Sequence, residues 1–363
     1  MLRQPARGSC PGPNPRRVLL KRIRIAAAAL LVATAALTAT SVSSAHSSHA
    51  TARTATLKIG LVTDIGGLND RSFNHLAYLG LLESQKKLGV QVKVLQSKSG
   101  SDYIPNLSTL AAQHYDLVIA VGFLMGDAVK AVSAQFPSTK FAIIDVDNPG
   151  AGGGKNVEGL TFHEEESGYV AGYLAGLMQK VKTSRNNGKN VVSTVGGVKI
   201  PPVDHYIAGF QAGAKAADPG VKTLNGYSNS FTDAAKCKSL AQSQLAQGSD
   251  VVFAVAGGCG LGALNAANSK GVWGVGVDAD QNYLGPYMLT SAVKKVDFAV
   301  YATVQKLKQG TFFGGKTTTF GIKNFAAGIS GYAKSVPSPV KTKVNAIIAK
   351  IKAGGIKIPN TVK

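Results

Sequence analysis

Cysteines and acidic side chains are scarce in this sequence. Its 363 residues include three cysteines, and 19 Asp and Glu stand against 40 Lys and Arg. No His or Cys lies at metal-ligand spacing beside Cys237 or Cys259, which argues against a metal site and favours a disulfide. Both lie near the carboxyl edge of the same predicted sheet, about a strand spacing apart, where a bridge is geometrically feasible. We therefore expect a Cys237–Cys259 disulfide, with two free buried thiols as the alternative, and no metal.

Continuous basic tracts are also absent. The formal net charge is +21, and subtracting the seven basic residues of positions 1–45 leaves +14. The lysines of this surplus occur singly or in pairs, and no arginine follows Arg185. Nucleic-acid sites gather their cations into stripes or clusters. The sequence therefore indicates a solvated basic surface with a membrane-facing preference, and we expect no nucleic-acid partner.

A long apolar run is missing as well. The apolar stretch at 25–40 is short for a membrane span and rich in Ala and Thr. Basic residues precede it and small residues at 43–45 follow it, an order typical of a secretory signal peptide. We predict a signal peptide at 1–45, with an uncleaved anchor as the alternative, and a flexible N-terminus at 46–55. The nearby Cys10 precedes the apolar run, so a lipid anchor is not supported. We expect an exported protein, periplasmic or associated with the outer face of the plasma membrane.

After this segment, short apolar runs alternate regularly with longer amphipathic stretches. Runs such as Leu117–Val121 are continuously apolar, as in strands that are buried on both faces of a parallel sheet. The alternation occurs twice without a detectable sequence repeat. It predicts the α/β class, with two doubly wound, Rossmann-like lobes. We expect one lobe from 56–161 with 282–313, and the other from 162–281 with 314–363.

Polar and aromatic residues follow several predicted strands at their carboxyl ends, where open parallel sheets bind ligands. Asp64 follows the first strand and can accept hydrogen bonds, while Phe73 and Asn74 near the next helix offer a ring and an amide. Phe123 follows the third strand as a second aromatic surface, and Asp145 ends the fourth. For Asp145, capping of the chain is an equal interpretation.

The second half carries further candidates. A glycine-rich run at 256–262 follows a strand and permits close approach of a ligand to the backbone around Gly258. The run lacks the Lys-Ser/Thr of a P-loop and the spacing of the dinucleotide fingerprint, so we expect no cofactor. Asp278 follows a later strand, where one carboxylate can accept from two vicinal hydroxyls. Lys294 follows a further strand and could pair with that acid or bond the ligand. For Asp278 the alternative is a solvated loop acid or a cap of the next turn, and for Lys294 it is a plain surface lysine.

A catalytic constellation is absent from the sequence. None of the six histidines pairs with a Ser or Cys in a nucleophile motif. The acidic run Glu164–Glu166 begins a predicted helix, where the helix dipole stabilises acids. We expect a binding protein and not an enzyme.

Several runs in the same order along the chain resemble the basic membrane protein family of ABC-transporter substrate-binding proteins. They are Asp64–Asn74, Gly122–Asp127, Phe162–Gly176, Gly196–Gly213 and Gly276–Gln281. Characterised relatives in that family include purine-nucleoside-binding lipoproteins. The resemblance implies a type I periplasmic-binding fold with three crossovers, and a monomer that binds a small polar ligand and docks on an ABC permease.

The resemblance also implies roles for single residues. It implies that a base stacks on Phe73, that Asp64 and Asn74 contact the base, and that Asp278 and Lys294 hold the ribose. A simple sugar remains the alternative ligand. A subunit that signals to a membrane receptor, or an enzyme such as a nucleoside hydrolase, remains the alternative function.

Overall fold

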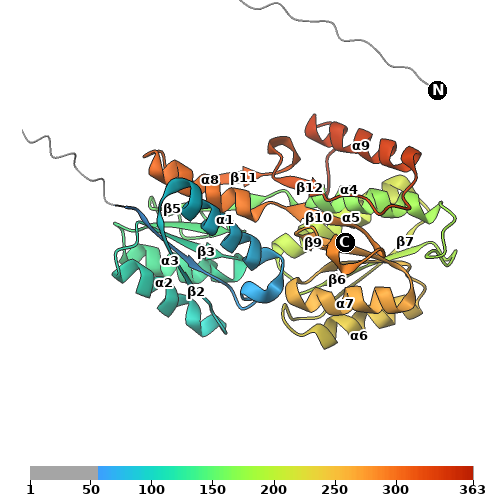
Figure 1. Ribbon diagram of the computed structural model, residues 1–363, viewed down its shortest axis with the longest axis horizontal. Coiled ribbons are helices and arrows are strands. Elements are labelled where there is room, and N and C mark those ends of the chain that lie inside the picture. Colours follow the sequence, from blue (N-terminus) through green and yellow to red (C-terminus); the bar gives the residue numbers. More distant parts are fainter. Residues whose placement is uncertain (1–55, 363) are drawn as a thin grey trace, which may run out of the picture. The chain divides into compact units, whose positions relative to one another are not determined.

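The computed structural model describes residues 56–362, which build two six-stranded sheets, each at the centre of one lobe (Figure 1). The first sheet has the order β11-β5-β4-β3-β1-β2 and is parallel throughout. Its strands are β1 (Lys58–Val62), β2 (Gln91–Leu95), β3 (Leu117–Val121), β4 (Lys140–Ile144), β5 (Val157–Phe162) and β11 (Lys316–Phe320).

The second sheet has the order β12-β10-β9-β8-β6-β7. Its strands are β6 (Val191–Gly196), β7 (Lys222–Tyr227), β8 (Val251–Val255), β9 (Trp273–Asp278), β10 (Met288–Lys294) and β12 (Ala327–Ile329). β12 runs antiparallel to β10, and the other pairs are parallel. The predicted α/β class with two doubly wound lobes is confirmed.

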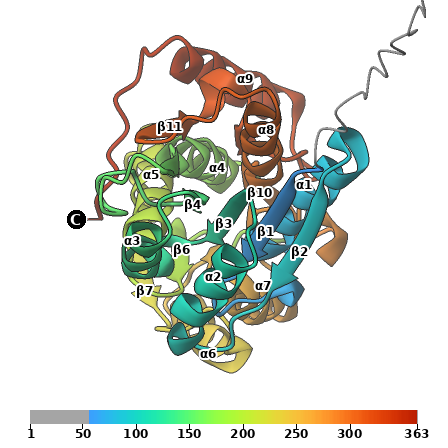
Figure 2. The same ribbon diagram turned by 90° about the vertical axis from the view of Figure 1, so that its left-hand side faces the viewer.

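Helices cover both faces of each sheet (Figures 1 and 2). In the first lobe, α1 (Phe73–Leu88) and α8 (Val296–Lys308) cover one face, and α2 (Tyr103–Ala112) and α3 (Gly126–Gln135) cover the other. In the second lobe, α4 (Glu164–Gln179), α5 (Pro201–Ala217) and α9 (Ser338–Lys352) cover one face, and α6 (Ala234–Ala246) and α7 (Gly257–Lys270) cover the other. This two-sided cover explains why every residue of β3 is buried and apolar.

The chain crosses between the lobes three times: from β5 to α4, from β10 to α8, and from β11 to β12. The resemblance implied this number, but the expected lobe boundaries after residue 281 are wrong. β10 pairs with β9 in the second sheet, and β11 pairs with β5 in the first. The local sequence predicts that a segment forms a strand. Which of the two sheets the strand joins depends on pairing with segments far away in the chain.

Two details of the elements concern the second lobe. β12 is a three-residue strand at the edge of its sheet, and α7 begins within the glycine-rich run, at Gly257. Among residues 56–362, no helix is both long and apolar enough to cross a bilayer. The predicted signal peptide at 1–45 and the flexible stretch at 46–55 lie outside the described residues.

Cys237 of α6 and Cys259 of α7 form a disulfide, with their Cα atoms 5.6 Å apart. Both residues are fully buried, and Cys259 lies within the glycine-rich first turn of α7. The bond therefore ties together two helices that lie on the same face of the second sheet.

Replacing both cysteines by serine is expected to lower the free energy of unfolding by about 3 kcal/mol, because the bond closes a loop of roughly 20 residues in the unfolded chain. Urea denaturation of the Cys237→Ser/Cys259→Ser variant beside the parent protein measures this. Non-reducing peptide mapping of exported protein should find the two cysteines joined. Two alkylatable thiols in that material would contradict the prediction.

Candidate ligand-binding site

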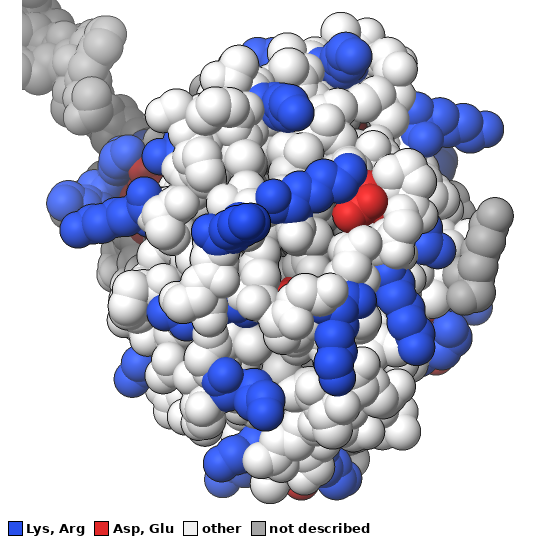
Figure 3. All heavy atoms as spheres, turned by 90° about the vertical axis from the view of Figure 1, so that its right-hand side faces the viewer, with Lys and Arg blue, Asp and Glu red and all other residues white. Residues whose placement is uncertain are grey.

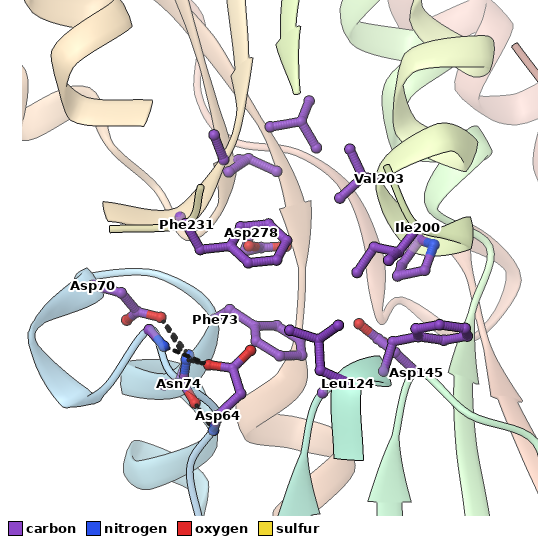
Figure 4. A pocket seen from close by; sticks show the side chains of 18 of the residues that line it. Asp64, Asp70, Phe73, Asn74, Leu124, Asp145, Ile200, Val203, Phe231 and Asp278 are labelled. Atoms are coloured by element: carbon purple, nitrogen blue, oxygen red, sulfur yellow. Dashed lines mark hydrogen bonds between the residues drawn. The ribbon is translucent and has the colours of Figure 1, made fainter. Parts of the chain in front are cut away.

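A cavity lies between the two lobes, at the carboxyl ends of the central strands of both sheets (Figure 4). It encloses about 590 Å³ free of protein atoms, including the part open to solvent. Side chains from both lobes line it, so a ligand in it would contact both at once.

The first-lobe wall of the cavity is a network of carboxylates around Asn74. The Asn74 side-chain nitrogen donates to Asp64 Oδ1 at 2.7 Å and to Asp70 Oδ2 at 3.1 Å (Figure 4). Asp70 also accepts backbone N–H groups of Ser72, Asn74 and His75, so it caps the start of α1. Asp64 Oδ1 accepts a second bond from the Gly66 N–H.

The other oxygen of Asp64, Oδ2, has no hydrogen-bond partner among the described residues. Burial raises the pKa of Asp64 to about 6, against the lowering effect of its bonds to Asn74 and Gly66. Gly122 explains the open space in front of this oxygen. A Cβ there would lie 3.0 Å from Asp64 Oδ2 and 3.3 Å from the Phe73 ring, and its φ of +113° is a conformation that glycine adopts easily. Asp64 Oδ2 is therefore free to accept a hydrogen bond from a ligand beside the Phe73 ring.

Two aromatic rings enter the cavity from opposite lobes. Phe73 begins α1 in the first lobe, and Phe231 lies in the loop between β7 and α6 in the second (Figure 4). The Lys294 ammonium lies over the Phe73 ring at 5.0 Å from its centroid. Apolar side chains of Leu124 and Val203 complete the space around the rings. Such an arrangement can hold a flat, partly apolar group.

Asp278 ends β9 with a left-handed backbone (φ 60°) and lies at the contact between the lobes. Its carboxylate accepts from Tyr206 Oη at 3.1 Å and lies 3.0 Å from Ser72 Oγ of the first lobe. Burial raises the pKa of Asp278 to about 6, although Lys294 and both hydroxyls lower it. Asp278 is 7% exposed and its carboxylate faces the cavity, which suits hydroxyl donors on a ligand.

Lys294 ends β10 and forms ion pairs with two carboxylates, one in each lobe. Its ammonium lies 2.5 Å from Asp145 Oδ1, in the first lobe, and 2.8 Å from Glu164 Oε1, at the start of α4. Glu164 also accepts from His205 Nδ1 at 3.0 Å. The three ion-pair partners are almost completely buried.

One lysine cannot neutralise two buried carboxylates. Burial raises the pKa of Asp145 to about 7 because the lowering effect of Lys294 is shared with Glu164. Burial also disfavours the charged form of Glu164. Its partners Lys294 and His205 favour that form more strongly, so the pKa of Glu164 is lowered. Burial works against the charge of Lys294 too, yet Asp145, Glu164 and Asp278 raise its pKa. Lys294 is therefore charged, and Asp145 is the carboxylate that titrates near neutral pH.

The structure brings seven of the eight residues proposed from the sequence to this one cavity. They are Asp64, Phe73, Asn74, Phe123, Asp145, Asp278 and Lys294. The exception is Gly258, which does not line it; the preceding residue, Gly257, does. Two pairings also differ from expectation. Lys294 bonds Asp145 and Glu164 instead of Asp278, and Glu164 is a buried partner of Lys294 and not only a favourable charge at a helix start.

Sequence reasoning missed four residues of the second-lobe wall of the cavity. They are Phe231, Tyr206, Ile200 and Val203. Phe231 carries a usable signal, since it follows β7 at the carboxyl edge of the sheet. Tyr206 carries none, because an aromatic residue in an amphipathic helix ordinarily packs into the core.

A possible metal site lies beside this network. Glu164, Glu165 and His205 bring potential ligand atoms within 4.8 Å of one another. However, both oxygens of Glu164 already accept from charged or polar donors, Lys294 and His205. We therefore assign no metal to this cluster.

Two α/β lobes joined by three crossovers, with a cavity between them that carboxylates and aromatic rings line, define a binding protein for small molecules. The chain belongs to the family described as ABC transporter substrate-binding protein PnrA-like, whose model matches residues 57–362. This confirms the resemblance to the basic membrane protein family. The family comprises substrate-binding proteins and not enzymes.

Individual relatives agree with this assignment. The chain is 34% identical to a CD4+ T-cell-stimulating antigen of Listeria monocytogenes, over 83% of this chain and 87% of that one. It is 36% identical to an ABC transporter nucleoside-binding protein BmpA of Lactococcus lactis, over 72% and 78% of the two chains. An ABC transporter solute-binding protein of Aeropyrum pernix shares the fold, with a TM-score of 0.75, 24% identity, and coverage of 85% and 94%.

Proposed function

We propose that this protein binds a purine nucleoside between its lobes and delivers it to an ABC permease outside the cytoplasm. The observation that carries the proposal is that two rings from opposite lobes, Phe73 and Phe231, line one cavity beside a buried carboxylate with an unpaired oxygen, Asp64. The rings suit the faces of a base, and Asp64 suits N–H groups on its edge. Asp278 suits the paired hydroxyls of a ribose. The name of the Lactococcus lactis relative supports the same ligand class.

The charges of the cavity favour a neutral ligand. Four carboxylates line it, those of Asp64, Asp70, Asp145 and Asp278. Among residues 56–362 the single lining cation is Lys294, which is already paired with acids. A phosphate would therefore meet unscreened negative charge without a free cation. The expected ligand is a nucleoside and not a nucleotide.

Calorimetric titration with a matched set of compounds tests this function. The set contains inosine, guanosine, adenosine, cytidine, ribose, glucose and inosine 5′-monophosphate. We expect the purine nucleosides to bind most tightly, and the monophosphate at least about tenfold more weakly than inosine. Tightest binding of a simple sugar, or equal binding of nucleoside and nucleotide, would contradict the proposal. Release of free base from inosine would show an enzyme instead.

Phe73→Ala and Phe231→Ala are each expected to weaken nucleoside binding about tenfold, because stacking on an aromatic ring contributes on the order of 1–3 kcal/mol per base. Phe325→Ala is the matched control, since Phe325 is 71% exposed and does not line the cavity. Calorimetry on the three variants measures the effect. Unchanged affinity in the Phe73 variant would remove that ring from the site.

Acidification is expected to weaken nucleoside binding while stabilising the empty protein. Burial raises the pKa of both Asp64 and Asp278 to about 6. Ligand donors bind the ionised carboxylates, so affinity should fall as the pH decreases from 7.5 to 5. In the empty protein, the pKa values of these two carboxyl groups, about 6, lie above the value of 3.8 in the unfolded chain. The two groups therefore stabilise the fold most below pH 3.8, and this contribution is lost as the pH rises through 6.

Calorimetry and thermal melts at pH 5 and 7.5 measure these opposite trends. Because the ligand-free melts and the affinities are recorded separately, a general loss of fold at low pH would be recognised. Affinity that stays constant between the two pH values would contradict the role of ionised Asp64 and Asp278.

A further inference from the structure

A large basic surface covers the outer end of the second lobe (Figure 3). Ten cations belong to it, from the loop between α4 and β6 and from the C-terminal segment that contains α9. They are Lys180, Lys182, Arg185, Lys189, Lys334, Lys341, Lys343, Lys350, Lys352 and Lys357. Residues 180–190 and 321–362 contain no Asp or Glu. We call these ten residues the basic face.

The loop and the C-terminal segment form one continuous surface. The Arg185 guanidinium lies over the Trp273 ring, 5.0 Å from its centroid. A surface hollow beside it is lined by Arg185, Tyr332 and Lys334. The Lys341 ammonium lies 5.8 Å from the centroid of Tyr332. Contacts therefore run from the loop to the start of α9.

Nearby acids neutralise little of this charge. Asp218 lies 3.5 Å from Lys180 and balances that lysine. Asp250 is fully buried, accepts from Gln179 and Asn187, and has its pKa raised by burial. Few acidic side chains appear among the Lys and Arg in Figure 3. The face therefore keeps a strong positive potential.

Helix stability does not explain all of these lysines. Lys341 lies at the end of the first turn of α9, which contains no acid, and Lys343 follows in the second turn. The positive end of the helix dipole lies at the first turn, so a cation such as Lys341 is unfavourable there. The presence of this lysine indicates a role other than stabilising the helix.

An exposed aromatic side chain lies at the rim of the basic face. Phe325 is 71% exposed, the highest value among the exposed large apolar residues of the described part. Its backbone is left-handed (φ 61°), an uncommon conformation for phenylalanine, and the Lys352 ammonium lies over its ring at 3.9 Å. An exposed ring with a lysine ammonium over it suits the boundary between lipid head groups and acyl chains.

We propose that the basic face docks this protein on a bilayer of anionic lipid. Nine of its ten cations are lysines, which act as point charges and suit a diffuse layer of phosphate head groups better than paired recognition of single carboxylates. The exposed Phe325 adds an apolar contact that a soluble polyanion would not use. The proposal does not depend on the identity of the ligand in the cavity.

Flotation with vesicles of phosphatidylglycerol and phosphatidylcholine tests the proposal. The test variant is Lys334→Gln/Lys341→Gln/Lys343→Gln/Lys352→Gln. The matched control is Lys86→Gln/Lys98→Gln/Lys130→Gln/Lys155→Gln, which removes four exposed lysines from the first lobe. Both variants keep the whole chain, so any contribution of the N-terminal residues is the same in each.

The parent protein should bind the anionic vesicles at about 0.1 M salt and be released at about 1 M salt, where charges are screened within a few ångströms. The test variant should bind about tenfold or more weakly, and the control less than about threefold more weakly. Thermal melts and titration with inosine must be unchanged in both variants, which separates docking from folding and from ligand binding. Equal losses in both variants, equally tight binding to pure phosphatidylcholine, or displacement from vesicles by low concentrations of duplex DNA would overturn the proposal.

Discussion

Replacing Lys294 by methionine is expected to lower the free energy of unfolding by about 3–5 kcal/mol at pH 8, because the change leaves two buried carboxylates without their cation. Asp145 and Glu164 both bond this ammonium and are almost completely buried. At pH 5 the loss should be smaller, since Asp145, with its pKa already raised to about 7 by burial, can take up a proton. Urea denaturation at both pH values measures the effect.

The neighbouring Lys295 provides the control, because it is exposed and forms no ion pair among the described residues. Lys295→Met should change stability by less than about 0.5 kcal/mol. Adding Asp145→Asn and Glu164→Gln to Lys294→Met should restore part of the lost stability, since no unpaired charge then remains. Equal effects of the two single substitutions would show that Lys294 does not neutralise the network.

Asp278→Asn is expected to weaken the binding of a purine nucleoside by about ten- to a hundredfold, while the binding of the free base changes little. The removed charge-assisted hydrogen bonds contribute about 1.5–3 kcal/mol, and only the ribose would use them. Asparagine keeps the shape of the side chain and tolerates the left-handed backbone of this position, so strain does not confuse the result.

Asp280→Asn is the matched control, because Asp280 lies two residues away, is exposed and does not line the cavity. Calorimetry with inosine and hypoxanthine on both variants separates a ribose contact from a general loss of binding. If the Asp278 variant binds the nucleoside and the free base more weakly by the same factor, this carboxylate does not bind the ribose hydroxyls.

The sequence was a good guide wherever the signal is local. β3 is continuously apolar because helices cover both faces of its sheet. Its five residues are enough to recognise this pattern in the sequence. Asp64, Asp145 and Asp278 were recognised because each follows a strand at the carboxyl edge, and parallel sheets bring such edges together. Lys294 was found in the same way, but its partners were not, since Glu164 precedes it by 130 residues.

The amino-acid sequence by itself determined the class of fold, the presence of two lobes and most of the polar residues of the cavity, because periodicity and strand ends are properties of neighbouring residues. The tertiary structure alone decided that β10 belongs to the second sheet and β11 to the first, since strand pairing joins segments far apart in the chain. It alone brought Phe231 opposite Phe73 and shared Lys294 between Asp145 and Glu164. These arrangements depend on how the two lobes pack against each other. A local pattern of residues does not contain that information, because the residues concerned lie far apart in the chain.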